Sequence, residues 1–399
     1  MGKREIATVE DDAIYDQVLA LLQQEFEGSQ DRIRARLELD PSASREKSLA
    51  AIVDGKVVSH LQILPREMRV GRSMVSVAGV ADVATIPAER GKGHVQALIE
   101  AALPRMVSGR FGISMVFSDE AEPFGSLGWS QFPVSTYVAD VSEGWGGVTD
   151  PGIRRMKPED DLIWVAALHG EYGSAYAGPL VRSLGWWSGN VTWMLENPES
   201  SVVLERQGRI VGYGRARYSD NPSGPGPEDD YSISDLAADD ADGEAALLRW
   251  FVKDARERGF QRISGQVPVP RRARKMFEKI GIRSRPREDN RMMLRLIDLR
   301  KLLNSLRPEF ASALASRKDN GAGSVGVHVG AGSAELSVRD CAVHIGPVQD
   351  PDPLVLSDAE LWALIFNGSV PGRAGSAKKR LLEALFKKRE FAFWRADVF

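Results

Sequence analysis

The chain has 399 residues, of which 43% are hydrophobic and 27% are charged, and its formal net charge is −3. This length predicts two or three domains with ordinary globular cores. The slightly acidic balance argues against a nucleic-acid partner, which usually requires a basic surplus. A single cysteine excludes intrachain disulfides and a cysteine-based zinc site.

The N-terminal sequence MGKREIATVEDDAIYDQ contains no apolar core of the signal-peptide type. No run of about 18 apolar residues without a charge occurs in the sequence. The five histidines show no metal-ligand spacing, so we expect no metal site. We therefore expect a cytoplasmic protein with no membrane partner.

Residues 5–28 predict a short strand and then an amphipathic helix. Residues 50–69 predict a hairpin that turns at Asp54-Gly55, and a second turn is expected at Gly71-Arg72. Residues 111–118 predict a further strand, which is followed by an acidic loop over residues 119–123.

The stretch between these elements, Ala78–Leu98 (AGVADVATIPAERGKGHVQAL), predicts a strand, a glycine-rich turn and a helix. Such a turn leaves several backbone N–H groups unpaired at the positive end of the helix dipole, so it can hold a phosphate group. Glycines let the backbone approach the anion without a Cβ in the way. The simpler alternative is an ordinary strand-to-helix connection.

The middle of the chain repeats this order weakly. A loop over residues 140–152 precedes a hairpin pattern at 202–218, a strand at 232–236 and a helix at 244–258. The connection at 237–243 carries three aspartates, which would repel a pyrophosphate. Trp186, Trp187 and Trp193 lie ahead of this hairpin, where they either wall a pocket or pack in a core.

The last hundred residues predict a small mixed region. We expect a strand at 292–297, a helix at 299–316, strands at 324–329 and 334–345, and helices at 358–366 and 376–386. Asp319-Asn320-Gly321 is a predicted hairpin turn.

Three features resemble one family. Arg90-x-x-Gly93-x-Val95, directly after a V-A-x-x-P strand, resembles the R-x-x-G-x-G/A pyrophosphate loop of the GNAT acyltransferases. Phe124-Gly125-Ser126-Leu127-Gly128-Trp129 is similar to the Y-x-x-F-G-Y/W element of the Eis-like (enhanced intracellular survival) branch. The chain also ends on an aromatic residue, Phe399, as that branch does.

The resemblance implies an α/β fold with mixed (α+β) sheets, in which tandem GNAT-like domains precede a small sterol carrier protein-like α+β domain. The expected bounds are 1–145 for a catalytic GNAT domain and 146–297 for a second, degenerate one. Residues 298–399 would form the sterol carrier protein-like domain and end in the catalytic C-terminus. The resemblance leaves a homo-oligomer open.

The resemblance also implies an acetyl-CoA-dependent N-acetyltransferase that acts directly on a primary amine. An extended backbone segment would pair with the pantetheine amides like an added strand, namely Val83, Ala84 and Thr85. The pyrophosphate would be held by the loop's backbone N–H groups with added positive charge, from Arg90, Gly91, Lys92, Gly93, His94, Val95 and Gln96. For the two basic side chains, the alternative is a solvated loop.

For the base, the resemblance implies the α-carboxylate of Phe399. Asp82, on the strand that lines the expected cleft, is a second candidate base, and its alternative is a capping carboxylate. Glu120, in the acidic loop, is a third catalytic candidate. That loop also suits a cationic amine, and its alternative is a solvated surface loop.

The sequence departs from the family pattern at the proton-donating tyrosine, where Phe124 stands. Ser118, Ser126, Glu120 or the more distant Tyr137 could take the donor's place. Otherwise the thiolate leaves by way of water, or the protein has lost activity. Two other functions therefore stay open: a non-catalytic acyl-CoA sensor, and an apolar-ligand carrier that uses the C-terminal region.

Overall fold

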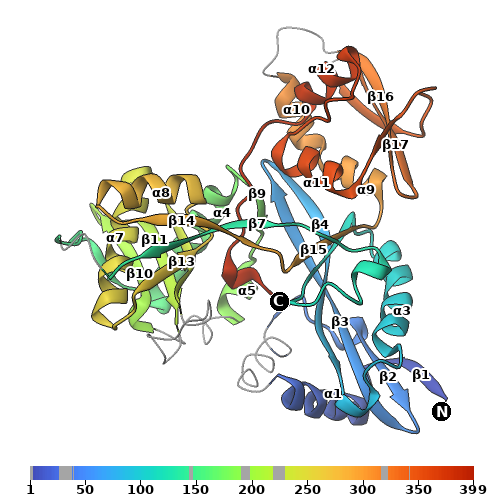
Figure 1. Cartoon of the computed structure of the whole chain (residues 1–399), viewed down its shortest axis with the longest axis horizontal. Helices are drawn as coiled ribbons and strands as arrows, with labels where there is room; N and C mark the ends of the chain where they lie inside the picture. Colours follow the sequence, from blue (N-terminus) through green and yellow to red (C-terminus); the bar gives the residue numbers. More distant parts are fainter. Residues whose placement is uncertain are drawn as a thin grey trace. The chain divides into compact units, whose positions relative to one another are not determined.

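The structure is a computed structural model, which describes residues 3–26, 38, 40–142, 147–189, 198–218, 230–315, 322–340 and 342–399. The predicted turn Asp319-Asn320-Gly321 and Trp193 lie outside the described residues. The chain divides into two compact units (Figure 1). Unit 1 comprises residues 1–132, residues 290–389 and Phe399, and unit 2 comprises residues 133–289 and 390–398.

The large sheet of unit 1 has the strand order β1-β2-β3-β4-β5-β15-β6. Its strands are β1 (Arg4–Thr8), β2 (Ser48–Val53), β3 (Lys56–Val70), β4 (Ser73–Thr85), β5 (Ile113–Phe117), β6 (Ser130–Gln131) and β15 (Met292–Leu296). Strand β4 is antiparallel to β3 and parallel to β5. The predicted class, α/β with mixed sheets, is confirmed.

Two helices cover opposite faces of this sheet. Helix α1 (Asp12–Glu25) packs its buried residues against Ala50 and Ala84, whereas α3 (His94–Ser108) packs against the face that carries Leu49. Successive strand residues point to opposite faces, so the adjacent Leu49 and Ala50 contact different helices. The N-cap of α1 is Asp11, whose carboxylate accepts the backbone N–H groups of residues 13 and 14.

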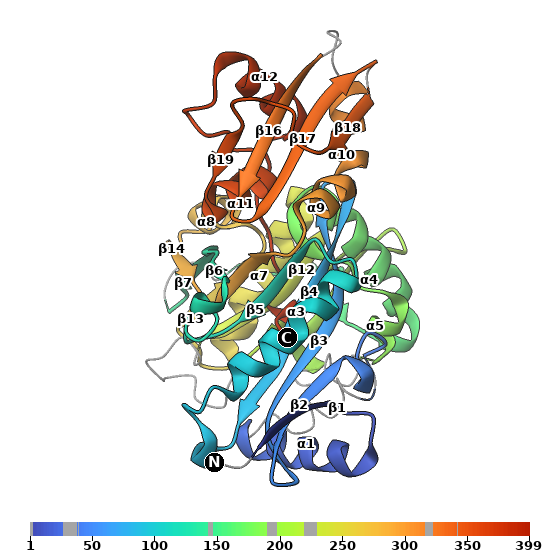
Figure 2. The ribbon, with the colours of Figure 1, turned by 90° about the vertical axis from the view of Figure 1, so that its right-hand side faces the viewer.

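The rest of unit 1 contains a second, smaller sheet with the order β18-β17-β16-β19 (Figure 2). Its strands are β16 (Gly323–Val329), β17 (Gly332–Arg339), β18 (Ala342–Gly346) and β19 (Leu354–Leu356). Its helices are α9 (Leu299–Ser305), α10 (Arg307–Ala315), α11 (Asp358–Asn367) and α12 (Ser376–Leu385). The helix predicted over 299–316 is thus two helices, since Pro308 has no N–H to continue α9.

Unit 2 contains one seven-stranded sheet with the order β14-β7-β13-β12-β11-β10-β8. Its strands are β7 (Val134–Asp140), β8 (Ile153–Arg155), β10 (Ser201–Arg206), β11 (Arg209–Arg217), β12 (Tyr231–Ala238), β13 (Arg262–Gly265) and β14 (Ser284–Asp289). Its helices are α4 (Pro158–Gly173), α5 (Leu184–Gly189), α7 (Ala241–Glu257) and α8 (Pro270–Lys279).

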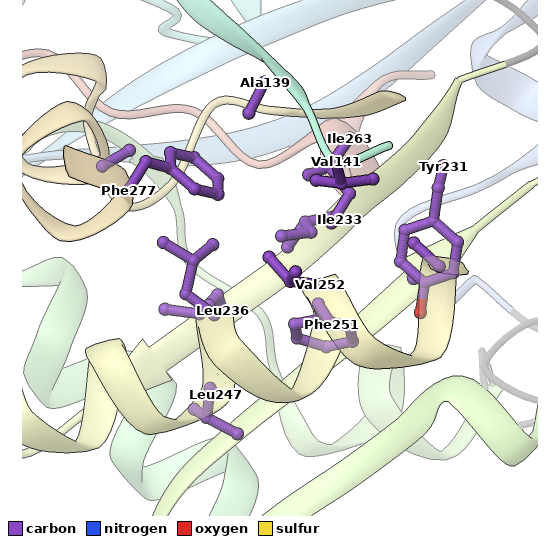
Figure 3. Packing of buried hydrophobic residues seen from close by; sticks show 14 of the residues in the cluster. Ala139, Val141, Tyr231, Ile233, Leu236, Leu247, Phe251, Val252, Ile263 and Phe277 are labelled. Carbon is purple, nitrogen blue, oxygen red and sulfur yellow. The ribbon is translucent and has the colours of Figure 1, made fainter. Parts of the chain in front are cut away.

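The core of unit 2 packs one face of this sheet against α7 and α8. Figure 3 shows Leu247 and Phe251 of α7 beside Leu236 of β12, with Phe277 of α8 in the same cluster. A second buried cluster on α4, α5 and β11 includes Trp187, which is fully buried, while Trp186 is partly buried against it. Trp187 therefore packs in a core.

Among the described residues, no helix is both long and apolar enough to cross a bilayer.

Candidate active site

The parallel pair β4–β5 opens partway along β4. The two strands pair only from Val77↔Ile113 to Val80↔Val116, although β4 continues to Thr85. Beyond Val80, the strand neighbours of β4 within the described sheet lie on the β3 side alone. At Val83–Thr85, the side of β4 that faces away from β3 has no paired strand among the described strands, so an extended ligand could add to it as a further strand. Val83–Thr85 is the predicted pantetheine segment.

A β-bulge reshapes this end of β4. His60 pairs with Ala84 and Gln62 with Ala81, so two residues of β4 face the single Leu61 of β3. Asp82, the first of these two, has φ +52° and a buried side chain. The imidazole Nδ1 of His60 lies 2.9 Å from the carbonyl oxygen of Asp82, which ties the bulge to β3. The structure thus places Asp82 at the opening, in a backbone conformation that few residues adopt.

The glycine turn after β4 is open. Gly91 and Gly93 have φ values of +75° and +73°, and Gly93 is the N-cap of α3. In the part of the chain that the structure describes, no group accepts a hydrogen bond from the backbone N–H groups of residues 91–96. A Cβ built on Gly91 would meet nothing within 4 Å. The turn therefore presents a row of free amides at a helix N-terminus, as an anion site requires.

The basic side chains of this turn are held by carboxylates. Arg90 donates from Nε to the carbonyl oxygen of Thr85 at 3.2 Å and forms an ion pair with Glu25. Lys92 Nζ lies 2.7 Å from Glu89 Oε1, and the buried His94 contacts the other oxygen at 3.0 Å. Hydrogen bonds from Lys92 and His94 hold the pKa of Glu89 below its usual value.

Arg4 is a third cation at the turn, and sequence reasoning missed it. Its guanidinium donates to the carbonyl oxygen of Gly93 at 2.7 Å. The strand β1 brings Arg4 there, because β1 pairs with β2 at the edge of the sheet. No local sequence signal connects Arg4 to a turn almost ninety residues later.

Phe399 lies at the start of the opening. The ring of Phe399 meets Phe117, the last residue of β5, edge-on with the ring centroids 5.4 Å apart. A Cβ on Gly79 of β4 would come within 2.6 Å of the Phe399 ring. The Arg66 guanidinium lies 5.6 Å from the centroid of the same ring. The terminal residue thus rests on β3, β4 and β5 where the parallel pairing ends.

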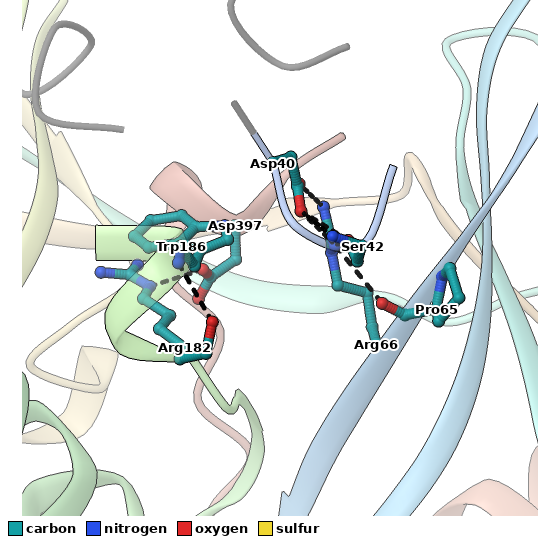
Figure 4. A network of polar contacts seen from close by, with 8 residues as sticks. Asp40, Ser42, Pro65, Arg66, Arg182, Trp186 and Asp397 are labelled. Atoms are coloured by element: carbon teal, nitrogen blue, oxygen red, sulfur yellow. Dashed lines mark hydrogen bonds and ion pairs between the residues drawn. The ribbon is translucent and has the colours of Figure 1, made fainter. Parts of the chain in front are cut away.

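Arg66 is fixed by a buried ion pair (Figure 4). Its guanidinium lies 2.5 Å from Asp40 Oδ2 and also donates to the hydroxyl of Ser42. Burial by itself raises the pKa of the Asp40 carboxyl, but the charge and hydrogen bonds of Arg66 outweigh it and lower that pKa. Asp40 therefore orients the cation that contacts the terminal ring.

We expect Gly79→Ala to displace the terminal ring, because the new Cβ would overlap it. If the chain performs the acetyl transfer expected from its sequence, turnover should fall by about 10- to 100-fold through loss of positioning, while the Kd for acetyl-CoA stays unchanged. Steady-state kinetics and calorimetric titration would measure the two quantities. Unchanged turnover would show that the ring's place on β4 does not matter for activity.

We expect Asp40→Asn to destabilise unit 1 by about 3 kcal/mol at neutral pH, because it leaves Arg66 buried without its anion. The folded-state pKa of Asp40 is lowered, so its stabilisation is present above its unfolded pKa of about 3.9 and is lost as pH falls through the folded value. The difference from wild type should therefore shrink below about pH 4. Urea unfolding at several pH values tests this, with Asp12→Asn, from an exposed ion pair, as the matched control.

The remaining candidates lie on the segment after β5 and on β7. Glu120 is exposed in the turn after β5, where the hydroxyl of Ser118 bonds both its carbonyl oxygen and its N–H. Phe124 is buried in the core of unit 1 against Trp129. Tyr137 lies in the sheet of unit 2, where burial raises its pKa. Ser126 donates its hydroxyl to the carbonyl oxygen of Pro123. The position of Phe124 thus carries no proton donor.

Across the described ranges, no group of three or more His, Cys, Asp and Glu side chains is arranged to hold a metal ion.

Comparisons with known proteins find similarity to N-acetyltransferases in sequence and in fold. Residues 5–132 match the family profile described as an acetyltransferase (GNAT) domain. An uncharacterised N-acetyltransferase from Streptomyces avermitilis is 26% identical over 197 residues, which span 45% of this chain and 46% of that relative. The alignment thus covers less than half the length of the curated relative.

Solved structures resemble the chain over its whole length. A GCN5-related N-acetyltransferase from Kribbella flavida has a TM-score of 0.69 at 18% identity, with all of both chains covered. Eis1 from Mycobacterium abscessus has a TM-score of 0.63 at 18% identity, with 98% of this chain and 99% of that one covered. A probable N-acyltransferase from Enterococcus faecalis V583 has a TM-score of 0.70 at 13% identity and full coverage of both chains. The chain therefore shares the fold of these structures, and its residues 5–132 match an acetyltransferase (GNAT) domain.

Proposed function

We propose that the protein is an acetyl-CoA-dependent N-acetyltransferase that transfers an acetyl group directly to a primary amine. The observation that carries the proposal is the meeting of three features in unit 1. These are the opened β4–β5 pair, the open amide row after it, and the terminal residue seated where the pairing ends. The opened strand pair would bind the extended arm of the acyl donor, and the amide row would bind its anionic pyrophosphate. The terminal residue would supply a carboxylate base.

The donor would be bound mainly by backbone. The pyrophosphate would accept hydrogen bonds from the N–H groups of residues 91–96, and Arg4, Arg90 and Lys92 would add positive charge near it. Because Arg90 and Lys92 already pair with Glu25 and Glu89, binding would exchange or extend these ion pairs. The pantetheine amides would pair with Val83–Thr85 on the open side of β4.

The reaction needs no covalent enzyme intermediate. The amine nitrogen attacks the thioester carbonyl carbon, a C–N bond forms, and the C–S bond breaks to release the thiolate of coenzyme A. The α-carboxylate of Phe399 would accept the proton that the amine loses, and Asp82 is the alternative base. A backbone N–H of Val83–Thr85 would stabilise the oxyanion that develops on the carbonyl oxygen.

Protonation of the leaving group does not require a side chain. A thiol has a pKa of about 8.5, so its anion leaves without the strong acid that an alkoxide requires. Water could therefore protonate the thiolate, although Phe124 provides no donor. Acetyl transfer therefore does not depend on a proton donor at position 124.

The absence of an ionisable group at Phe124 favours one rival function, a non-catalytic acyl-CoA sensor. Such a protein would keep the amide row and bind acetyl-CoA without acylating any amine. The sterol carrier protein-like character of the C-terminal region and an apolar-ligand carrier remain predictions from the sequence.

One experiment separates the two functions. Purified protein is incubated with acetyl-CoA and a panel of primary amines that includes aminoglycosides, polyamines and lysine peptides, and release of free thiol is followed. The transferase predicts amine-dependent thiol release together with an acetylated product. Tight acetyl-CoA binding without thiol release above the rate in buffer, for any amine of the panel, would support the sensor instead.

A further inference from the structure

The sheet of unit 2 opens at the same place as the sheet of unit 1. Strand β12 is parallel to β13 only from Tyr231↔Ile263 to Ile233↔Gly265, although it continues to Ala238. It is antiparallel to β11, with a register break between Arg215 and Ala216. Strand β12 thus has the same two kinds of neighbour as β4 and also a break in its antiparallel ladder.

An equivalent backbone hydrogen bond occurs in each unit, and it allows the two openings to be aligned residue by residue. Just after β4, the N–H of Ile86 donates to the carbonyl oxygen of Val58 at 3.0 Å. Just after β12, the N–H of Asp239 donates to the carbonyl oxygen of Val211 at 2.9 Å. The last parallel pair lies six residues earlier in both strands, at Val80 and at Ile233. Val83 lies three residues before Ile86, and Leu236 lies three residues before Asp239, so Leu236 is the counterpart of Val83.

In unit 2 the chain's own C-terminal segment occupies this opening. The indole N–H of Trp394 donates to the carbonyl oxygen of Leu236 at 3.2 Å. The guanidinium of Arg395 donates to the hydroxyl of Ser232 at 3.1 Å. Leu236 is the counterpart of Val83. In unit 1 the proposed acyl donor would pair with Val83, whereas in unit 2 the tail bonds the carbonyl oxygen of Leu236.

The tail enters along Ala177 and Gly178. The N–H of Ala392 donates to the carbonyl oxygen of Ala177 at 2.9 Å, and the N–H of Ala177 donates to the carbonyl oxygen of Glu390 at 3.2 Å. A Cβ on Gly178 would lie 2.5 Å from the carbonyl oxygen of Ala392, and the φ of this glycine is +108°. Only glycine lets the tail pass this closely at that φ.

A buried ion cluster holds the far end of the tail (Figure 4). Arg182 lies 2.7 Å from Asp397 through Nε and 2.8 Å from Asp235 through Nη2. All three side chains are at most 1% exposed, and the guanidinium also lies over Trp186 at 4.5 Å. Asp235 sits on β12, beside the position where the tail meets Leu236. Arg182 thus joins the last turn of the tail to the opened strand.

The N-terminus of α7, the helix after β12, does not offer an anion-binding site either. Asp240 is the N-cap of α7, and its carboxylate accepts the N–H of Gly243 at 2.7 Å. An internal carboxylate therefore stands where a phosphate would bind a helix N-terminus, as the three aspartates of this connection predict. Neither the strand edge nor the helix end of unit 2 is free for an acyl donor.

We propose that unit 2 is a receptor for the protein's own C-terminal segment, Glu390–Val398, and that Arg182 is a positioning residue for the terminal carboxylate. The second part rests on the proposed function, in which that carboxylate is the base. Phe399 follows the anchored Asp397 by two residues, which span at most about 7 Å of extended chain. The anchor therefore limits where the carboxylate can go, and a loosened anchor leaves the base poorly placed.

Three variants of the full chain test the anchor. Asp397→Asn removes one charge from the pair, Arg182→Lys keeps the charge but loses the fork that spans both aspartates, and a glycine inserted between Val398 and Phe399 lengthens the arm. Asp352→Asn, which removes an almost fully exposed carboxylate that pairs with Lys378, is the matched control. In the first two variants, we expect carboxypeptidase to release Phe399 faster and the amides of residues 390–398 to exchange faster.

The kinetic expectation separates a positioning role from a general structural one. In all three variants kcat should fall by about 10- to 100-fold, with the Kd for acetyl-CoA and the melting temperature of unit 1 unchanged. Arg182→Lys should retain more activity than Asp397→Asn. If Phe399 release and amide exchange stay at wild-type rates in Asp397→Asn, the anchor does not hold the tail and the proposal fails.

Failure of the proposed function gives a different pattern. If the terminal carboxylate is not the base, blocking it chemically leaves turnover intact, while Asp397→Asn still speeds release of Phe399. If the carboxylate is the base but Arg182 does not position it, blocking abolishes turnover whereas Asp397→Asn and the inserted glycine leave kcat unchanged. The two outcomes cannot be confused.

Discussion

Adding one glycine after Phe399 should lower kcat by about 100- to 10,000-fold, the range expected when a general base is lost. The added residue converts the α-carboxylate of Phe399 into an amide, which cannot accept a proton from the amine. It also moves the new carboxylate one residue past the ring that Phe117, Gly79 and Arg66 hold. Thiol release under saturating acetyl-CoA measures kcat, and calorimetric titration measures the Kd for acetyl-CoA, which should not change.

Two companion variants separate charge from bulk. A C-terminal amide on Phe399, made by ligation, removes the charge with no added residue and should be as inactive as the extended chain. Phe399→Leu keeps the carboxylate and loses the aromatic anchor, so it should retain part of the activity. Wild-type turnover in the amidated protein would rule out the terminal base and make Asp82 the leading candidate.

Gly93→Val should weaken acetyl-CoA binding at least tenfold, which corresponds to about 1.4 kcal/mol. Gly93 has φ +73°, a conformation that costs a side chain with a Cβ about 1–2 kcal/mol and is worst for a β-branched residue. The turn would relax, and its amides would no longer converge on one anion. Titration with acetyl-CoA, and with coenzyme A alone, measures the loss.

Gly208→Val is the matched control for this variant. Gly208 has φ +72° in the β10–β11 turn of unit 2, and a Cβ there would meet nothing within 4 Å. Both variants should lose similar thermal stability, whereas only Gly93→Val should lose acetyl-CoA affinity. Equal affinity in the two proteins would mean that the amide row at residues 91–96 does not bind the donor.

Local patterns in the sequence predicted the strand, turn and helix of the proposed donor site. The run Val80–Ile86, the two glycines and the helical spacing after His94 predict strand, turn and helix, and the structure has β4, an open turn and α3 there. All these elements depend on neighbours within a few residues, so a window of about twenty residues contains the information. The aspartates of the connection at 237–243 were readable for the same reason, and one of them caps α7.

Strand partnership could not be predicted in this way. Strand β7 lies before the predicted boundary at 145 yet joins the unit 2 sheet, and β15 lies before 297 yet joins the unit 1 sheet. The residues of a strand show which of its two faces is apolar. Which sheet the strand joins depends on partner strands far along the chain. Arg4 at the turn and Asp40 beneath Arg66 are further cases of the same limit.

The sequence by itself determined a glycine turn whose amides can hold an anion, a side chain without an ionisable group at Phe124, and the aromatic character of Phe399. Only the tertiary structure decided that Phe399 rests on Gly79, some three hundred residues earlier, and that Arg182 and Asp235 hold Asp397. The reason is physical. A turn or a helix end is built from neighbouring backbone groups, while a buried ion cluster or a seated ring exists only after distant strands have paired and excluded water.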